Sequence, residues 1–515
     1  MTTTARGGGA FRRVSGDQPG ITPGAVLGGI AAGIAAGAFV GIAGPLPAIA
    51  LVLGIVGLAV IARMPGVLLA MYLLIPFYKG AVQPYLPVDL TIILAFACML
   101  QAIPWLLVPG SRDLRGISVA GTVLWVAIAA LVLAGTLWAA DPTAAAQKAG
   151  TFWILVVIPL VAACLRVSSK RMYVHQLAWS FFGLGALTVV LGMAYMTSTD
   201  RLAILGMNTI NVAVAAMLVP LVGLAFVIGA RAQWARIVAL TLTPLAFLVA
   251  LASGSRGAIL TLLILGLVVG ARSVARARVV RTKVVVGALL GAAAILGAVV
   301  LAWAVLPAAS LARFTAFGSF VSGVFGGGGA PTGDTSSEAR ARLIGVAYQM
   351  WLDHPILGVG TAGFASLSPA YVGPLLADAY PHNSVMQFAS EYGTVGVAAF
   401  GAFVTLALTR RLPRDAAWTT VRLLAAFFLL NGLLSNDILD DRTMWGLLLL
   451  LLLVRESSSR GGELDTGVVG EPTRPAASDG SGTVEVAAGR SAAASPGRPT
   501  CARRISPSMS GITTS

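Results

Sequence analysis

The residues best suited to chemistry lie in one polar stretch, residues 338–397, which contains two of the three histidines of the chain. His382 comes just before an apolar run, in the sequence YPHNSVMQF. An unperturbed histidine titrates near about pH 6.5 and can accept a proton at neutral pH, so His382 is a candidate general base. Asn383 is placed to orient His382 or the substrate. The alternative is a structural histidine at a membrane interface, and His354, in LDHPILGVG, is interpreted as capping a turn with Asp353.

Arg256 is the first candidate for binding a phosphate group. It lies in LASGSRGAIL, between two apolar runs, where small neighbours such as Ser255 let a bulky group approach the backbone. An arginine near the middle of a membrane costs about 2.5–3.5 kcal/mol on insertion scales, so its presence there asks for an explanation. Its planar guanidinium donates paired hydrogen bonds to phosphate oxygens. The alternative is a turn arginine whose side chain reaches the membrane surface.

Three further arginines extend this candidate anion site. Arg201, in STDRLAILGMNTINV, precedes an apolar run and is interpreted either as a second anion contact or as a polar helix cap. Arg340 and Arg342 are two residues apart and therefore lie on different sides of a helix. We expect one of them to reach the site while the other stays in solvent, and we favour Arg342.

Carboxylates are sparse around these residues, and this limits the chemistry. No Asp-x-Asp pair stands beside a histidine, so a metal-dependent nucleotide-sugar transferase is not indicated. Neither a phosphate-binding loop motif nor a serine nucleophile elbow occurs. An enzyme with this residue set would use an already activated substrate and no metal, and its arginines suit a lipid-linked diphosphate. The main carboxylates of the predicted outer side are Asp200, Asp334, Asp353, Asp378, Glu391, Asp437, Asp440 and Asp441.

The composition indicates a polytopic membrane protein. Of its 515 residues, 57% are hydrophobic and 11% are charged, against about 25% charged in a soluble domain. The net charge of +15 comes from short basic clusters between apolar runs, which is the pattern of cytoplasmic loops. No basic face with aromatic side chains indicates nucleic-acid binding. The three cysteines show no CxxC spacing, so neither a disulfide framework nor a metal site is expected.

Apolar runs predict an all-α fold with about twelve to fourteen transmembrane helices, since a span needs about 20 mostly apolar residues. The first run is interpreted as a spanning helix and not as a cleaved signal. Spans are predicted at 24–43, 46–62, 66–78, 89–108, 117–138, 151–167, 176–196, 209–229, 237–252, 257–271, 284–306, 392–409, 416–434 and 442–454.

The basic clusters predict the orientation. With the N-terminus in the cytoplasm, alternation of the spans puts every cluster on the cytoplasmic side and the long segment after residue 306 on the outer side. Lys79 and Lys148, on the outer side, are interpreted as ordinary loop residues. The chain then divides into a basic cytoplasmic N-terminus (1–23), transmembrane helices (24–306), an extracytoplasmic loop with two helices (307–391), three C-terminal spans (392–454) and a disordered cytoplasmic tail (455–515).

The outer segment has parts of different character. Residues 323–337 are glycine-rich, and the following residues 338–352 have the periodicity of a helix. The glycines of LGVG, with the preceding proline, end this helix, and a second helix is expected to begin near His382 and Asn383. The apolar stripe of the first helix consists of Leu343, Val346, Ala347 and Met350.

Three segments of the chain, in this order, resemble the O-antigen ligase and O-antigen polymerase family. They are SGSRGA (Ser253–Ala258), DHPILGVGTAGF at the close of the outer helix (Asp353–Phe364), and PHNSVMQFASEYGTVG (Pro381–Gly396). In the last segment a His-Asn pair is followed by Glu391 and spaced glycines. The resemblance covers roughly residues 200–455.

The resemblance implies an integral membrane glycosyltransferase of the GT-C type that needs no cofactor and no metal. Such an enzyme moves glycan from undecaprenyl diphosphate to a glycan or lipid acceptor at the outer face of the bacterial cytoplasmic membrane, with inversion at the anomeric carbon. The family's proposed base matches His382. Its diphosphate-binding arginines match Arg256, Arg201 and Arg342, with Arg340 nearby. The residues expected to support them are Asn383, Ser255 and Glu391.

Two other interpretations remain open from the sequence. One is a non-catalytic transporter or flippase for a lipid-linked or anionic solute, which would use the same arginines for binding. Transporters favour polar residues near the membrane midplane and internal repeats, and neither is evident here. The other is a structural membrane subunit whose tail recruits a cytoplasmic partner, which leaves His382 and the arginines unexplained. A ligase and a polymerase differ only in the acceptor, which the sequence does not name.

Overall fold

The computed structural model describes residues 63–86, 88–107, 117–196, 202–227, 233–276, 335–373, 380–435 and 437–454. Within these ranges the regular elements are helices, and no β-strand occurs. The spans predicted at 24–43, 46–62 and 284–306 lie outside the described residues. The same holds for the N-terminus at 1–23, most of the glycine-rich segment and the tail at 455–515.

Apolar helices dominate the described part of the chain. Seven are long and apolar enough to cross a membrane, and four shorter ones are apolar as well. Each coincides with a span predicted from the sequence, which confirms an all-α, polytopic membrane protein. These helices are α3 (Pro65–Val82), α4 (Leu90–Leu107), α5 (Val119–Ala134), α6 (Pro142–Phe152) continuing into α7 (Ile158–Ser168), α8 (Arg171–Ala194), α9 (Thr209–Val222), α10 (Gln233–Ala252), α11 (Arg256–Arg276), α16 (Ser384–Thr409), α17 (Ala416–Ser435) and α18 (Arg442–Leu452).

One predicted span begins too late. The sequence predicts a helix over 151–167, whereas the apolar helix runs over Pro142–Ser168, with a π-helical turn at Trp153–Val157 joining α6 to α7. Asp141 caps this helix, because its Oδ1 accepts hydrogen bonds from two backbone N–H groups of the first turn, both at 3.0 Å. Lys148 therefore lies inside a helix, and Lys79 lies inside α3, where it pairs with Asp89. The interpretation of both lysines as loop residues is wrong.

Helix ends that carry basic residues meet at one end of the bundle. Asp415, just before α17, accepts a hydrogen bond from Arg171 Nε and lies 3.1 Å from His175 Nε2, both in the first turns of α8. Arg410, at the end of α16, donates to the Val454 carbonyl at 2.9 Å. Burial raises a carboxyl pKa, but here a backbone N–H, His175 and Arg171 outweigh it and lower the pKa of Asp415. These contacts join α8, α16, α17 and the end of α18.

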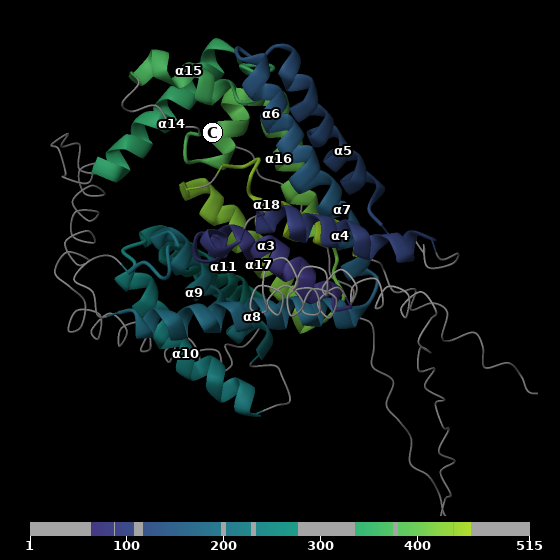
Figure 1. The fold of residues 1–515 in the computed structure, drawn as a ribbon, viewed down its shortest axis with the longest axis vertical. Coiled ribbons are helices and arrows are strands. Elements are labelled where there is room, and N and C mark those ends of the chain that lie inside the picture. The colour runs from purple at the N-terminus through teal and green to yellow at the C-terminus, as the bar shows by residue number, and fades with distance from the viewer. Residues whose placement is uncertain are drawn as a thin grey trace, which may run out of the picture. The chain divides into compact units, whose positions relative to one another are not determined.

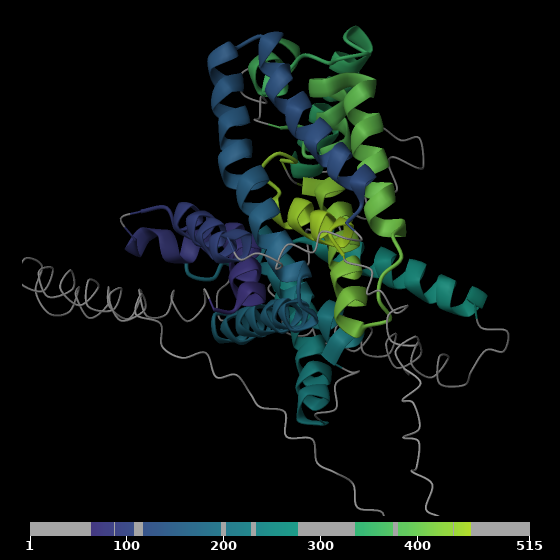
Figure 2. The same ribbon diagram turned by 90° about the vertical axis from the view of Figure 1, so that its right-hand side faces the viewer.

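Two further helices, α14 (Thr335–Asp353) and α15 (Gly363–Val372), lie beside the end of α5 and the start of α6 (Figures 1 and 2). The segment between them is tied to the end of α5, since Thr361 N donates to the Gly135 carbonyl at 3.2 Å. The predicted apolar stripe of α14 is buried together with Phe364 of α15, which confirms that this stripe is a packing surface. α14 also packs against α16.

α16 is broken at Gly393, and the chain before α15 fills the break. Gly393 has φ 63° and ψ −159°, a conformation that is almost restricted to glycine. The carbonyls of Ser390 and Glu391 accept hydrogen bonds from Val359 N at 2.8 Å and Gly360 N at 2.9 Å. On the other side of the break, Thr394 N donates to the Pro355 carbonyl at 2.8 Å. The LGVG and EYG motifs are therefore two halves of one structure.

Gly393→Ala is expected to destabilise the protein by about 1–3 kcal/mol from backbone strain alone. A Cβ at this position would also overlap the Ile356 carbonyl oxygen. The matched control is Gly401→Ala in the same helix, where a Cβ meets open space and the better helix propensity of alanine favours folding. Thermal unfolding of both variants in detergent measures the difference. Equal midpoints for the two variants would contradict a requirement for glycine at the break.

Candidate active site

The starts of α16 and α11 both pack against the last turn of α17. Asn383 Nδ2, just before α16, donates to the Leu433 carbonyl at 3.0 Å, and Ser384 Oγ donates to the Gly432 carbonyl at 2.9 Å. At the start of α11, a Cβ built on Gly257 would lie 3.7 Å from Leu434 Cδ1. His382 and Arg256, the chain neighbours of Asn383 and Gly257, thus flank the same turn of α17.

His382 is held by an unusual backbone conformation and by its neighbour. Its φ of 57° lies in the left-handed region, which histidine enters more readily than most residues. Asn383 caps α16, because its Oδ1 accepts a hydrogen bond from Met386 N at 3.0 Å. Both polar atoms of the Asn383 amide therefore bind backbone groups, and the residue orients the His382 segment. The half-buried imidazole packs on the Tyr380 ring, with 4.5 Å between the ring centroids.

Arg256 is the first residue of α11 and is half-buried. The turn before it is closed by two hydrogen bonds, Ser253 Oγ to the Ala250 carbonyl at 2.7 Å and Ser255 N to Ser253 Oγ at 3.3 Å. Gly254 occupies the left-handed position of this turn, with φ 69°. Ser255 is buried and shapes the turn that presents Arg256.

Two of the other three predicted arginines lie in the described ranges, both on α14. Arg201 lies outside those ranges, although Leu202 N donates to the Ala252 carbonyl at 3.2 Å, close to the turn before Arg256. Arg340 is half-buried and Arg342 is exposed, both on the first half of α14. The sequence favoured Arg342 over Arg340, whereas Arg340 is the less exposed of the two.

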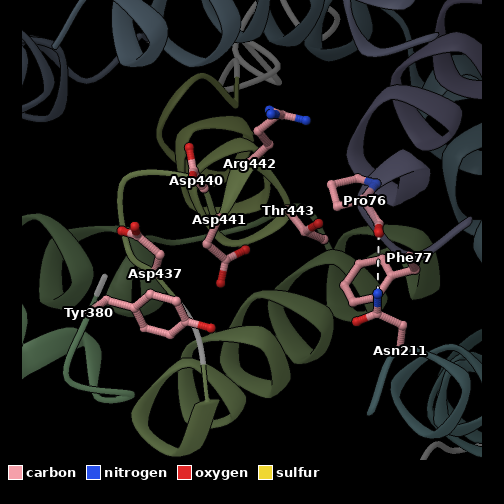
Figure 3. Close-up of a pocket in the computed structure, with 9 residues that line it drawn as sticks. All are labelled: Pro76, Phe77, Asn211, Tyr380, Asp437, Asp440, Asp441, Arg442 and Thr443. Carbon is pink, nitrogen blue, oxygen red and sulfur yellow. Dashed lines mark hydrogen bonds between the residues drawn. The ribbon is translucent and has the colours of Figure 1, made fainter. Parts of the chain in front are cut away.

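A pocket of about 240 Å³ opens beside these residues, and Figure 3 shows its lining. Tyr380, which packs on His382, forms one wall, and the loop between α17 and α18 forms another. The hydroxyl of Tyr380 and the carboxylate of Asp441 point toward one another across the pocket (Figure 3). The complete lining is Pro76, Phe77, Asn211, Tyr380, Asp437, Asp440, Asp441, Arg442 and Thr443.

The aspartates of this loop were not among the site residues predicted from the sequence. The signal was present in DILDDR (437–442), where three carboxylates and an arginine lie between two spans. Partial burial, and then the negative charge of Asp437, raise the pKa of the Asp440 carboxyl. Among the described residues, no three His, Cys, Asp or Glu side chains come together as a metal site.

A buried clamp fixes the start of this loop. Asp437 accepts hydrogen bonds from Lys148 Nζ of α6 and from Gln387 Nε2 of α16, both at 2.8 Å. The other end of the same amide, Gln387 Oε1, accepts from Ile438 N at 2.9 Å. The side chains of Lys148 and Asp437 are only 17% and 12% exposed. The pair therefore lies largely out of water and sets the path of the loop toward the pocket.

The rest of the loop is anchored to its surroundings as firmly as its start. Asp441 caps α18 by accepting a hydrogen bond from Met444 N at 2.9 Å. Thr443 Oγ1 donates to the Leu73 carbonyl of α3 at 2.6 Å. These bonds hold the lining residues of the pocket against α3.

Glu391 lies behind this clamp and does not line the pocket. Its side chain is fully buried, and its carboxyl group lies near the backbone of Ala362 and the side chain of Gln387. It follows Gln387 by four residues, so the two side chains share one face of α16. The positive charge of Lys148 acts on it.

Residues 239–401 match the family described as O-antigen ligase. The match includes Arg256, the two arginines of α14, His382 and Glu391, and it ends before the loop that lines the pocket. No curated protein matches the chain.

Proposed function

The chain belongs to the O-antigen ligase family by way of residues 239–401, and from this premise we propose that it transfers glycan from undecaprenyl diphosphate to a glycan or lipid acceptor. The observation that carries the proposal is that Asn383 and Gly257, the chain neighbours of His382 and Arg256, both lie against the last turn of α17. A base and a phosphate-binding cation at the same place are the two groups that such a transfer needs.

In the proposed reaction, an acceptor hydroxyl attacks the anomeric carbon of the donor. A new glycosidic C–O bond forms as the bond from that carbon to the diphosphate oxygen breaks, and the configuration is inverted. His382 receives the hydroxyl proton. Arg256 stabilises the negative charge that develops on the leaving undecaprenyl diphosphate. No metal is required, because the phosphate ester is already an activated donor.

The distribution of charge supports a site at the outer face. The helix ends around Asp415 carry the basic residues that cytoplasmic loops favour. The candidate site lies at the opposite ends of the same helices, at the start of α16, the end of α17 and the start of α18. We therefore propose a multi-pass protein of the bacterial cytoplasmic membrane with both termini inside and the site outside.

The test is the envelope glycan profile of cells that lack the gene, with the lipid-linked glycan analysed separately. Long lipid-linked chains that fail to reach their acceptor would identify a ligase, and accumulated single repeat units would identify a polymerase. Purified full-length protein in nanodiscs should also release undecaprenyl diphosphate in an acceptor-dependent manner, in the presence of a chelator. Unchanged profiles in both pools, together with no transfer by the purified protein, would refute the proposal in favour of a transporter or structural subunit.

A further inference from the structure

The pocket beside Tyr380 has a lining that suits one sugar ring. Its volume of about 240 Å³ is below the roughly 300–1,000 Å³ of pockets for drug-sized ligands. Two aromatic side chains, Phe77 and Tyr380, form opposite parts of the wall, and polar groups fill the space between them (Figure 3). Aromatic faces pack against the C–H face of a sugar, while carboxylates and amides bind its hydroxyls.

One polar atom of the lining is buried without a partner among the described residues, Arg442 Nε. Asp440 lies in the same lining, close enough to Arg442 for the two charges to interact. Buried polar groups without partners are costly unless a ligand or water satisfies them. Both residues belong to the loop that the Lys148–Asp437 clamp holds in place, so their positions are set before a ligand arrives.

The charge of the pocket discriminates between kinds of ligand. Asp437 is neutralised by Lys148, which leaves Asp440 and Asp441 facing the single positive charge of Arg442. An anionic group would meet an excess of negative charge, and like charges brought together in a partly dry site cost affinity. A diphosphate therefore fits the pocket poorly, whereas hydroxyl and amino groups can donate to the carboxylates.

Resting on the proposed function, we propose that this pocket is the acceptor subsite, which holds the sugar that carries the attacking hydroxyl and selects a neutral or amino sugar over a uronic acid. Tyr380 connects the pocket to His382, so a ring held there presents a hydroxyl toward the base. Asp440 is the residue that sets the selectivity, because its carboxylate lines the pocket and has neither the helix-capping role of Asp441 nor the ion pair of Asp437.

The test measures the direct binding of simple glycosides to the full-length protein in nanodiscs, with saturation-transfer NMR as the readout. The probes are the methyl glycosides of glucose, glucosamine and glucuronic acid. We expect the first two to bind, and the glucuronide to bind at least about tenfold more weakly, which corresponds to about 1.4 kcal/mol. Asp440→Lys should reverse this order. The control is Asp353→Lys, an exposed carboxylate on α14 that does not line the pocket, and it should keep the wild-type order.

Equal binding of the three glycosides, binding of none, or an order that Asp440→Lys leaves unchanged would overturn the acceptor subsite. Transfer activity is measured separately on the same preparations. A protein that transfers glycan but shows no such selectivity refutes only the subsite. A protein that selects among the glycosides as expected but transfers no glycan refutes the proposed function and leaves a sugar-binding pocket. The two failures are therefore distinguishable.

Discussion

A His382→Asn variant is expected to lose glycan transfer by about 10²–10⁴-fold, the usual contribution of a positioned general base. Asparagine removes the titrating nitrogen but tolerates the left-handed backbone that His382 adopts, with φ 57°. Alanine would add backbone strain at this position and confuse a loss of chemistry with a loss of structure. The measurement is the initial rate of undecaprenyl diphosphate release by the purified protein.

The matched control is His354→Asn. His354 is exposed at the end of α14 and lies in none of the contacts that define the site, so this variant should keep the wild-type rate. A His382→Asn protein that folds normally and transfers glycan at the wild-type rate would refute the assignment of His382 as the base.

A Lys148→Met variant is expected to lose about 3–5 kcal/mol of folding stability, the usual cost of removing one partner from a buried ion pair. Two carboxylates depend on this amine. Asp437 is bonded to it at 2.8 Å, and the charge of the amine also acts on the fully buried Glu391. Methionine keeps the length of the side chain, so the loss isolates the charge. Thermal unfolding in detergent, compared with wild type, measures it.

The double variant Lys148→Met/Asp437→Leu tests whether the carboxylate left without its cation causes the loss of stability. Removing both charges takes away the uncompensated carboxylate of Asp437, so the double variant should be more stable than Lys148→Met alone. It should still transfer glycan poorly, because the bonds of Asp437 to Lys148 and Gln387 are then lost and only the bond from Ile438 N to Gln387 Oε1 still holds the start of the loop. A single variant as stable as wild type would show that the pair contributes nothing to folding.

The sequence predicted the helices well because apolar length is a strong signal in a membrane protein. The failure at α6 has a physical reason. The first turns of this helix contain small and polar residues, among them Gln147 and Lys148, so an apolar window misses them although Asp141 supplies a good cap. The burial of Lys148 depends on Asp437, which lies 289 residues later in the chain, and no local pattern contains that information.

The sequence indicated which types of residue would form the site, but it did not indicate all of the residues that form it. His382 and Arg256 stood out because each is a costly residue next to an apolar span, and their chain neighbours Asn383 and Gly257 both lie against the last turn of α17. Which loops meet at that turn is decided by helix packing, so the role of Asp440 and Arg442 was not evident. The aspartates of DILDDR were visible in the sequence, but they lie far from any histidine along the chain and were therefore not assigned to the site.

The break in α16 has a consequence for the biogenesis of the protein. Backbone groups left unpaired in lipid cost several kcal/mol each, so a span broken at Gly393 is not stable by itself. The groups that complete it, from Pro355 to Gly360, precede α16 in the chain. They are synthesised first and, in the proposed topology, have already crossed the membrane when α16 is inserted. The segment that pairs with the broken helix is therefore synthesised before α16 itself.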